Sequence, residues 1–303
     1  MIKVSSNSIG KLQKCARAYK YSYIDNLEPV HRPSFFGFGS AMHAAIEAYR
    51  RGARTIAELR SAMMPYAEEL SSDDLCKLTA MVEAYWKRYA KDREVFAHIE
   101  QEFGYMRDEV EVIGVIDAID MGGRIWESKT TSSIDGAYIE ALPHARQTLM
   151  YAAFLLSMGE EITGVVYDII QKPRISRALA TPEEKRRYVK DKETKQMRLS
   201  ARQRERDETD AEYLNRLRAW YDKHPEAFHR EEISYTAQQL KDIKQEVFDE
   251  VNRIQWHMQT GKWPRSRSSC YGRTGKCEFL ALCNSSDNPI VKDAHYQEKE
   301  FRR

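Results

Sequence analysis

One stretch, residues 113–130, constrains the fold more than any other part of the chain. Its two halves are rich in β-branched and aromatic residues, which favour strands, and the Gly-Gly pair at 122–123 is typical of a hairpin turn. Asp117 then lies on the first strand, and Glu127 and Lys129 lie on the second. Because side chains alternate across a strand, Glu127 and Lys129 are predicted to point to the same face. The hairpin therefore brings two carboxylates and one ammonium group together at one end.

This combination of side chains is suited to metal-assisted chemistry. Hard divalent cations prefer oxygen ligands such as carboxylates. An ammonium group beside the cation orients a water molecule or stabilises negative charge that develops during a reaction. A Glu-x-Lys triplet also occurs by chance on exposed strands, so this interpretation depends on support from the rest of the chain.

The segments around the hairpin predict the remaining architecture. Hydrophobic periodicity and turn residues predict a helix over 40–50, strands over 95–103, 109–119 and 124–130, a helix over 143–158 and a strand over 162–170. The three consecutive strands form an antiparallel meander. The last strand is apolar almost throughout, as expected for a strand that is buried on both faces. The sequence thus predicts an α/β fold with the order helix, three strands, helix, strand.

The length of 303 residues fits one large domain or two modest ones. We expect a single domain over 1–303 with a helical insertion at 51–93, a basic helical insertion at 171–232 and a C-terminal cysteine segment at 256–303. The net charge is only +2, but residues 172–230 hold 17 Lys/Arg against 11 Asp/Glu, a local excess of +6. Two interpretations of this excess remain open: a solvated pair of charged helices, or a basic flap that contacts the phosphates along a DNA path.

The chain has five cysteines and lacks both a long apolar run and an apolar signal core, so we expect a cytoplasmic protein with no membrane span. Cysteines in that compartment are rarely paired in disulfides, which favours ligation of a metal or a cluster. Cys270, Cys277 and Cys283 are close in sequence, and three thiolates leave a tetrahedral or cubane site one ligand short. Cys15, on a helix predicted over 5–24, is the natural fourth ligand.

Asp117 followed by the Glu-Ser-Lys triplet at 127–129 resembles the signature of the PD-(D/E)XK nucleases. The flanking residues Gly114 and Thr130 resemble the motifs of the RecB-type branch of that superfamily. The resemblance implies a restriction-endonuclease-like α/β core, in agreement with the order of elements predicted from periodicity.

Two further patterns resemble motifs of the same branch. The first is Gly39-x-x-x-His43, whose His is a metal ligand in the branch, although a lone His on a helix is commonly a structural residue. The second is Gln147-x-x-x-Tyr151, whose side chains share one helical face and which lies beside the active site and DNA in the branch. An acidic residue on the strand before the hairpin often supports the site as well, and Glu102 is the better match.

The resemblance implies a role for each of these residues. His43, Asp117 and Glu127 would bind one or two Mg²⁺ or Mn²⁺ ions, with the Ser128 carbonyl as a further ligand. Lys129 would position or deprotonate the attacking water. The residues implied to contact DNA are Gln147, Tyr151, Lys172 and Arg174.

The cysteine pattern resembles the iron–sulfur staple of AddB and of CRISPR-adaptation exonucleases, in which four cysteines hold a [4Fe-4S] cluster that joins the two ends of the nuclease domain. The corresponding ligands here would be Cys15, Cys270, Cys277 and Cys283. The N-terminal motif keeps its cysteine and its aromatic residue, Tyr19, but lacks the usual proline. A Zn²⁺ site is the main alternative, and a set of reduced structural cysteines is the other.

Together these resemblances imply a Mg²⁺- or Mn²⁺-dependent deoxyribonuclease, an exonuclease that hydrolyses single-stranded DNA or DNA ends in replication, recombination or repair. The long basic stretch and the chain length resemble phage or prophage versions, which would act in the host cytoplasm, with a helicase or a recombination protein as candidate partner. Two alternatives remain open: a non-catalytic iron–sulfur DNA-binding module, and a component that trims DNA in CRISPR adaptation beside an integrase.

Overall fold

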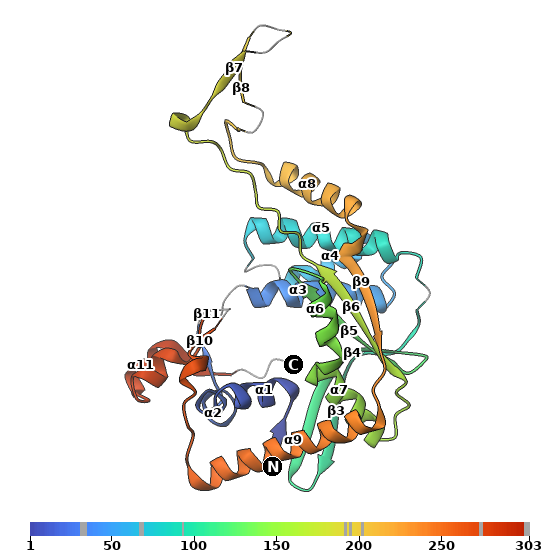
Figure 1. Ribbon diagram of the computed structural model, residues 1–303, viewed down its shortest axis with the longest axis vertical. Coiled ribbons are helices and arrows are strands. Elements are labelled where there is room, and N and C mark those ends of the chain that lie inside the picture. Colours follow the sequence, from blue (N-terminus) through green and yellow to red (C-terminus); the bar gives the residue numbers. More distant parts are fainter. Residues whose placement is uncertain are drawn as a thin grey trace.

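The computed structural model describes residues 1–30, 35–66, 70–92, 94–190, 193, 196–200, 203–272 and 275–299. Short parts of both predicted insertions and of the C-terminal segment lie outside these residues. Within the described residues, a six-stranded mixed sheet forms the centre of the molecule (Figure 1). Its strands are β1 (Ile2–Val4), β3 (Phe96–Arg107), β4 (Val110–Asp120), β5 (Arg124–Thr131), β6 (Gly164–Gln171) and β9 (Phe228–Ile233).

The predicted order of elements is confirmed. Strands β3, β4 and β5 pair antiparallel in succession, and β6 then pairs parallel with β5. Helix α3 (Phe35–Arg50) precedes this meander, and helix α7 (Arg146–Ser157) connects β5 to β6. The sheet is completed by β1, which runs parallel to β4, and by β9, which runs antiparallel to β6. The protein therefore has the predicted α/β core.

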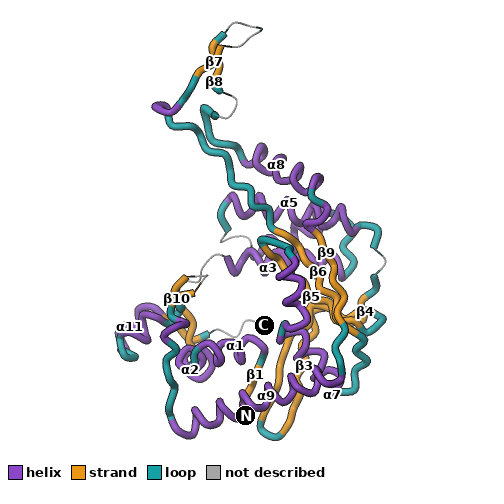
Figure 2. Tube along the Cα trace, viewed as in Figure 1, coloured by secondary structure: helices purple, strands orange, loops and turns teal. Residues whose placement is uncertain are grey.

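Helices cover both faces of this sheet (Figure 2). Besides α3 and α7, the described residues form the helices α1 (Ser6–Lys14), α2 (Ala16–Tyr19), α4 (Ile56–Met63), α5 (Ser72–Tyr89), α6 (Gly136–Ala141), α8 (Asp210–Lys223), α9 (Ala237–Thr260), α10 (Leu280–Asn284) and α11 (Pro289–His295). The two faces of β6 pack against different helices. Tyr167 and Ile169 belong to the core formed with α1, α7 and α9, whereas Ile170 packs with α3, α5 and α8. Every residue from 165 to 170 is buried, as predicted for this strand.

The turn between β4 and β5 forms as the Gly-Gly pair predicts. Gly123 has φ +76°, and a Cβ atom there would meet the carbonyl oxygen of Glu161 at 2.3 Å, so only glycine fits. The carboxylate of Asp120 accepts hydrogen bonds from the backbone N–H groups of Gly122 (2.9 Å) and Arg124 (3.0 Å). This side chain thereby holds the turn in place, a role that Asp commonly has in turns.

Three predictions about the elements need correction. Helix α3 begins at Phe35, five residues before the start of the helix that we predicted over 40–50. The helix predicted over 5–24 is broken at Cys15, whose backbone is extended (φ −164°, ψ 113°). The segment 171–232 is helical only in part, because α8 is its main helix and its last residues form β9. Phe228 and Ile233 at the two ends of β9 are buried against the rest of the core, which explains why this segment joins the sheet.

Three small strand pairs lie outside the central sheet. β2 (Leu27–Pro29) pairs with β12 (Tyr296–Glu298), β10 (Tyr271–Gly272) pairs with β11 (Gly275–Lys276), and β7 (Tyr188–Lys190) pairs with β8 (Met197–Leu199). The β7–β8 hairpin stands away from the body of the molecule at the end of two extended segments (Figure 1). In the parts of the chain that the structure describes, no helix has the length and apolarity to cross a membrane.

Candidate active site

The end of the β4–β5 hairpin carries the predicted carboxylates and ammonium group. Glu127 and Lys129 lie on the same face of β5, and Lys129 Nζ is 2.5 Å from Glu127 Oε1. Lys129 Nζ also donates a hydrogen bond to Gln147 Oε1 on α7, at 3.1 Å. Strand alternation therefore predicted the relative orientation of these two side chains correctly.

Asp117 and His43 meet beside this pair, although they are far apart in sequence. Asp117 is 8% exposed, and its Oδ2 accepts a hydrogen bond from the Ser128 N–H at 2.8 Å. His43, on α3, places Nδ1 3.5 Å from the same Oδ2. Burial lowers the pKa of His43 below its usual value, although Asp117 opposes this shift. A neutral imidazole results, which is the form that binds metal ions.

Glu100 on β3 completes a group that could hold a metal ion. One ligand atom from each of His43, Glu100 and Asp117 lies within 4.8 Å of the other two. The sequence had favoured Glu102, but Glu102 is exposed and has no part in this group. Glu100 has a left-handed backbone with φ +50°, an uncommon conformation for a residue other than glycine. Its neighbours Ile99 and Gln101 pair with Ala118 and Ile116, the two neighbours of Asp117 on β4, and this register brings Glu100 beside Asp117.

The carboxylate of Glu127 is the most deeply buried group of the site. The residue is 1% exposed, and its Oε2 atom has no hydrogen-bond partner within the described residues. Burial, together with the charge of Asp117, raises the pKa of Glu127 to about 7. Burial and the charge of Asp117 likewise raise the pKa of Glu100 to about 7. A buried carboxylate oxygen without a partner is costly, so this set of oxygen donors with one imidazole fits a hard divalent cation.

Helix α7 covers the site from the side. Gln147 contacts Lys129, and its Nε2 lies 3.4 Å from the hydroxyl of Tyr151 one turn later. Tyr151 is only 6% exposed, and its ring packs edge-on against Phe103. A Cβ atom on Gly114 would lie 2.5 Å from both rings, so this glycine lets α7 approach β4 closely. Tyr151 therefore acts mainly as a packing residue that supports Gln147.

Lys172 and Arg174 follow β6 on the side of the sheet where β5 ends. Arg174 is exposed, and its Nε donates a hydrogen bond to the carbonyl of Ser132 at 2.8 Å. Lys172 differs, because its Nζ lies 4.3 Å from the centroid of the Phe38 ring and burial lowers its pKa. Of the two, Arg174 is the more accessible to a polyanion.

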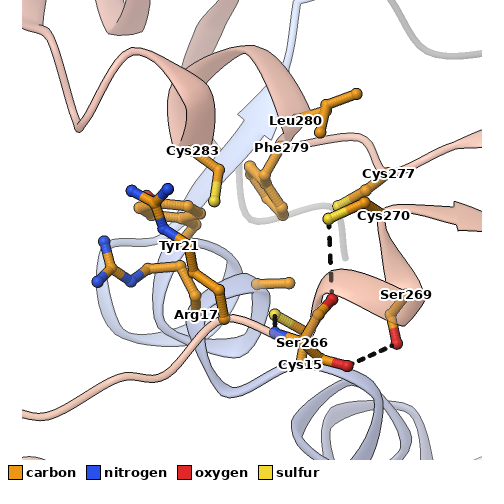
Figure 3. Close-up of a pocket in the computed structure, with 12 residues that line it drawn as sticks. Cys15, Arg17, Tyr21, Ser266, Ser269, Cys270, Cys277, Phe279, Leu280 and Cys283 are labelled. Carbon is orange, nitrogen blue, oxygen red and sulfur yellow. Dashed lines mark hydrogen bonds between the residues drawn. The ribbon is translucent and has the colours of Figure 1, made fainter.

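The predicted cysteine set gathers at a second place, away from these carboxylates. Cys15, Cys270, Cys277 and Cys283 line one pocket together with aromatic and aliphatic neighbours, among them Phe279 (Figure 3). The break at Cys15 between α1 and α2 turns this residue toward the C-terminal segment, where the Ser266 N–H lies 3.4 Å from Cys15 Sγ. The fifth cysteine, Cys76, is buried elsewhere and contacts Asp210 and Arg177.

Comparison with known proteins agrees with this arrangement. The family model of the PD-(D/E)XK nuclease superfamily matches residues 3–284, a span that includes the hairpin and all four cysteines of the pocket. A search of curated proteins gives no match to the chain. Because the family model covers nearly the whole sequence, the chain belongs to the PD-(D/E)XK nuclease superfamily.

Proposed function

We propose that this protein is a metal-dependent DNA exonuclease that acts on single-stranded DNA or on DNA ends in replication, recombination or repair. Its superfamily consists of nucleases that use divalent metal ions. The observation that carries the proposal is the convergence of His43, Glu100 and Asp117, whose ligand atoms lie within 4.8 Å of one another. The unpartnered buried oxygen of Glu127, whose pKa is raised by burial and by the charge of Asp117, supports the same site.

In this proposal each residue has a defined task. His43, Glu100, Asp117 and Glu127 hold Mg²⁺ or Mn²⁺, and the Ser128 carbonyl is a further candidate ligand. When bound, the cation supplies Lewis-acid polarisation of the phosphate. Lys129 orients or deprotonates the attacking water, and its contacts with Glu127 and Gln147 support this role.

The direct test is cleavage of end-labelled single- and double-stranded DNA with Mn²⁺, with and without EDTA. We expect metal-dependent cleavage by the wild type and its loss in Asp117→Ala. Glu102→Ala is the matched control, because it removes an exposed carboxylate from β3 and is expected to cleave like the wild type. Cleavage by Asp117→Ala at the wild-type rate would show that the site is assigned wrongly. A folded wild type that binds DNA without cleaving it would instead favour the non-catalytic binding module.

We also propose that Cys15, Cys270, Cys277 and Cys283 bind a [4Fe-4S] cluster. All four cysteines line the same pocket, although they come from both ends of the chain. Four thiolates are the usual ligand set of a [4Fe-4S] cluster. The apolar neighbours Phe279 and Leu282 support it as well, because they shield such a group from water.

The proposed assignment of the protein to a branch of its superfamily rests on the same cysteines. A staple that joins an N-terminal and a C-terminal segment supports membership of the RecB-type branch, in the AddB-like or CRISPR-adaptation group. We propose a phage or prophage version that acts in the host cytoplasm, with a helicase or a recombination protein as partner. An integrase as the partner would correspond to a role in CRISPR adaptation, and co-purification of the two proteins would distinguish the roles.

The basic segment between β6 and β9 supports nucleic-acid binding at its outer end. Where the segment joins the body of the molecule, carboxylates neutralise its arginines. Arg177 pairs with Asp73 (2.6 Å), and Arg216 pairs with Glu208 (2.6 Å). Farther out, the hairpin and the turn before it expose Lys185, Arg187 and Lys190. We propose that these outer cations contact phosphates of the substrate, while the inner ion pairs anchor the segment to the body.

Replacing Lys185, Arg187 and Lys190 together with alanine is expected to weaken DNA binding and to make it less dependent on salt. Each lost phosphate contact lowers the slope of log K against log salt by about 0.7 to 0.9. Fluorescence anisotropy over a range of NaCl concentrations measures both quantities. The control replaces three exposed lysines elsewhere, at positions 223, 241 and 262. Equal effects in the two triple variants would mean that the hairpin does not contact DNA.

A further inference from the structure

A buried arginine joins helix α3 to the strand that carries the Glu-x-Lys triplet. Arg50 lies two turns after His43 on α3, and its side chain is only 2% exposed. Its Nη2 donates a hydrogen bond to Ser128 Oγ at 2.8 Å and lies 3.7 Å from Asp168 Oδ2 on β6. The Arg50 guanidinium also lies 5.8 Å from the centroid of the Trp126 ring on β5. Arg50 therefore contacts β5 and β6 from the face opposite to Glu127 and Lys129.

The charge of Arg50 is balanced within the core. Asp168 has no exposed surface, and its Oδ2 accepts a hydrogen bond from the hydroxyl of Tyr85 at 2.7 Å. Its Oδ1 lies 3.4 Å from Nε of Arg230, which in turn pairs with Asp92 at 2.6 Å. Buried charges of this kind are tolerated only when they are paired and hydrogen-bonded. The pairing keeps the Arg50 side chain in one position.

Ser128 is the point where this buried network meets the metal-binding group. Its side chain accepts the hydrogen bond from Arg50 on one face of the sheet. Its backbone N–H donates to Asp117 Oδ2 at 2.8 Å, and the same Oδ2 lies 3.5 Å from Nδ1 of His43. One residue of β5 is thus held by both Arg50 and Asp117. Since His43 and Arg50 belong to the same helix, the Arg50–Ser128 contact fixes the position of that helix relative to Asp117.

We propose that Arg50 is a positioning residue that sets the metal affinity of the site by holding α3 to β5 through Ser128. The inference rests on the proposed function, because it takes His43 and Asp117 as metal ligands. Groups that orient the ligands of a metal commonly change its affinity by 10- to 100-fold when they are removed. The role differs from general stabilisation, because the expected defect lies in metal binding and disappears when the metal is saturating.

The test is a Mn²⁺ titration of the protein without DNA. The electron paramagnetic resonance signal of free Mn²⁺ measures how much of the ion remains unbound. Ser128→Ala removes only the hydroxyl, and we expect it to weaken Mn²⁺ binding about 10-fold. We expect Arg50→Lys to weaken Mn²⁺ binding by about 10- to 100-fold. The cleavage rate of both variants is expected to recover at saturating Mn²⁺. Tyr85→Phe is the matched control, because it removes a hydrogen bond to Asp168 without touching Ser128, and we expect its Mn²⁺ affinity to stay within about 2-fold of wild type.

The outcomes separate this inference from the proposed function. Wild-type protein that binds no Mn²⁺ would overturn both. Wild-type protein that binds Mn²⁺ with the same affinity as Ser128→Ala would overturn only the positioning role. Equal losses in Ser128→Ala and Tyr85→Phe would also overturn it, because they would point to a general effect on the core. If Arg50→Lys does not fold, the comparison of Ser128→Ala with Tyr85→Phe still decides the question.

Discussion

Replacing Lys129 with alanine is expected to slow DNA cleavage by about 10²- to 10⁴-fold, the range typical for loss of a group that transfers or orients a proton. Lys129 Nζ is 2.5 Å from Glu127 Oε1 and 3.1 Å from Gln147 Oε1, so it lies within the group of carboxylates while remaining partly exposed. This change removes none of the candidate metal ligands. We therefore expect Mn²⁺ to bind and the chemical step to fail.

The measurement is single-turnover cleavage of end-labelled DNA at saturating Mn²⁺, which excludes effects of product release. Lys241→Ala is the matched control: it removes an exposed ammonium group from α9, a helix that carries none of the candidate site residues. We expect the control to change cleavage far less than Lys129→Ala. A Lys129→Ala protein that cleaves at the wild-type rate under these conditions would show that the hairpin is not the catalytic centre.

Replacing Cys15 with serine is expected to abolish the cluster and to destabilise the whole protein. The energy of metal ligation is largely folding energy in small metal-bound segments. The pocket around Cys15 is built from two ends of the chain, α2 and the C-terminal segment, which also share the β2–β12 pair and an apolar cluster that includes Tyr21, Phe279 and Tyr296. Loss of several kcal/mol would lower the melting temperature by about 10 °C for a protein of this size.

Broad visible absorption and the iron content of anaerobically prepared protein measure the cluster, and thermal unfolding measures stability. Cys76→Ser is the matched control, because Cys76 is a buried thiol that lies outside the pocket. It is expected to keep the wild-type colour and iron content. A colourless wild-type protein that contains zinc would contradict the cluster and support the zinc alternative.

The sequence predicted those parts of the molecule that depend on local periodicity. The meander, the position of α7 and the shared face of Glu127 and Lys129 all follow from the spacing of apolar and polar residues along one element. The Gly-Gly pair predicted the turn, because left-handed backbone at that position requires glycine. These features depend on local sequence and not on contacts with distant segments of the chain.

The sequence could not predict features that arise from tertiary packing or from exceptions to the periodic pattern. Glu100 rather than Glu102 reaches His43 and Asp117, because the pairing of β3 with β4 decides which of the two carboxylates lies beside Asp117. Cys15 breaks a helix that its neighbours favour, because its pocket lies toward the C-terminal segment. Asp168 is buried on β6 and pairs with both Arg50 and Arg230, which come from two other elements that no local pattern connects to it.

The pairing of β2 with β12 has a consequence for the order in which the chain acquires its structure. Residues 27–29 are made well before their partners at 296–298. At a synthesis rate of about 5 to 20 residues per second, β2 waits on the order of 10 to 60 s for its partner. During that interval Tyr21 and Leu27 lack the apolar residues of the later segment that cover them in the finished protein. The nascent chain thus carries an unpaired strand and an open apolar surface until residue 298 has been added, which is a period when a chaperone would have much to bind.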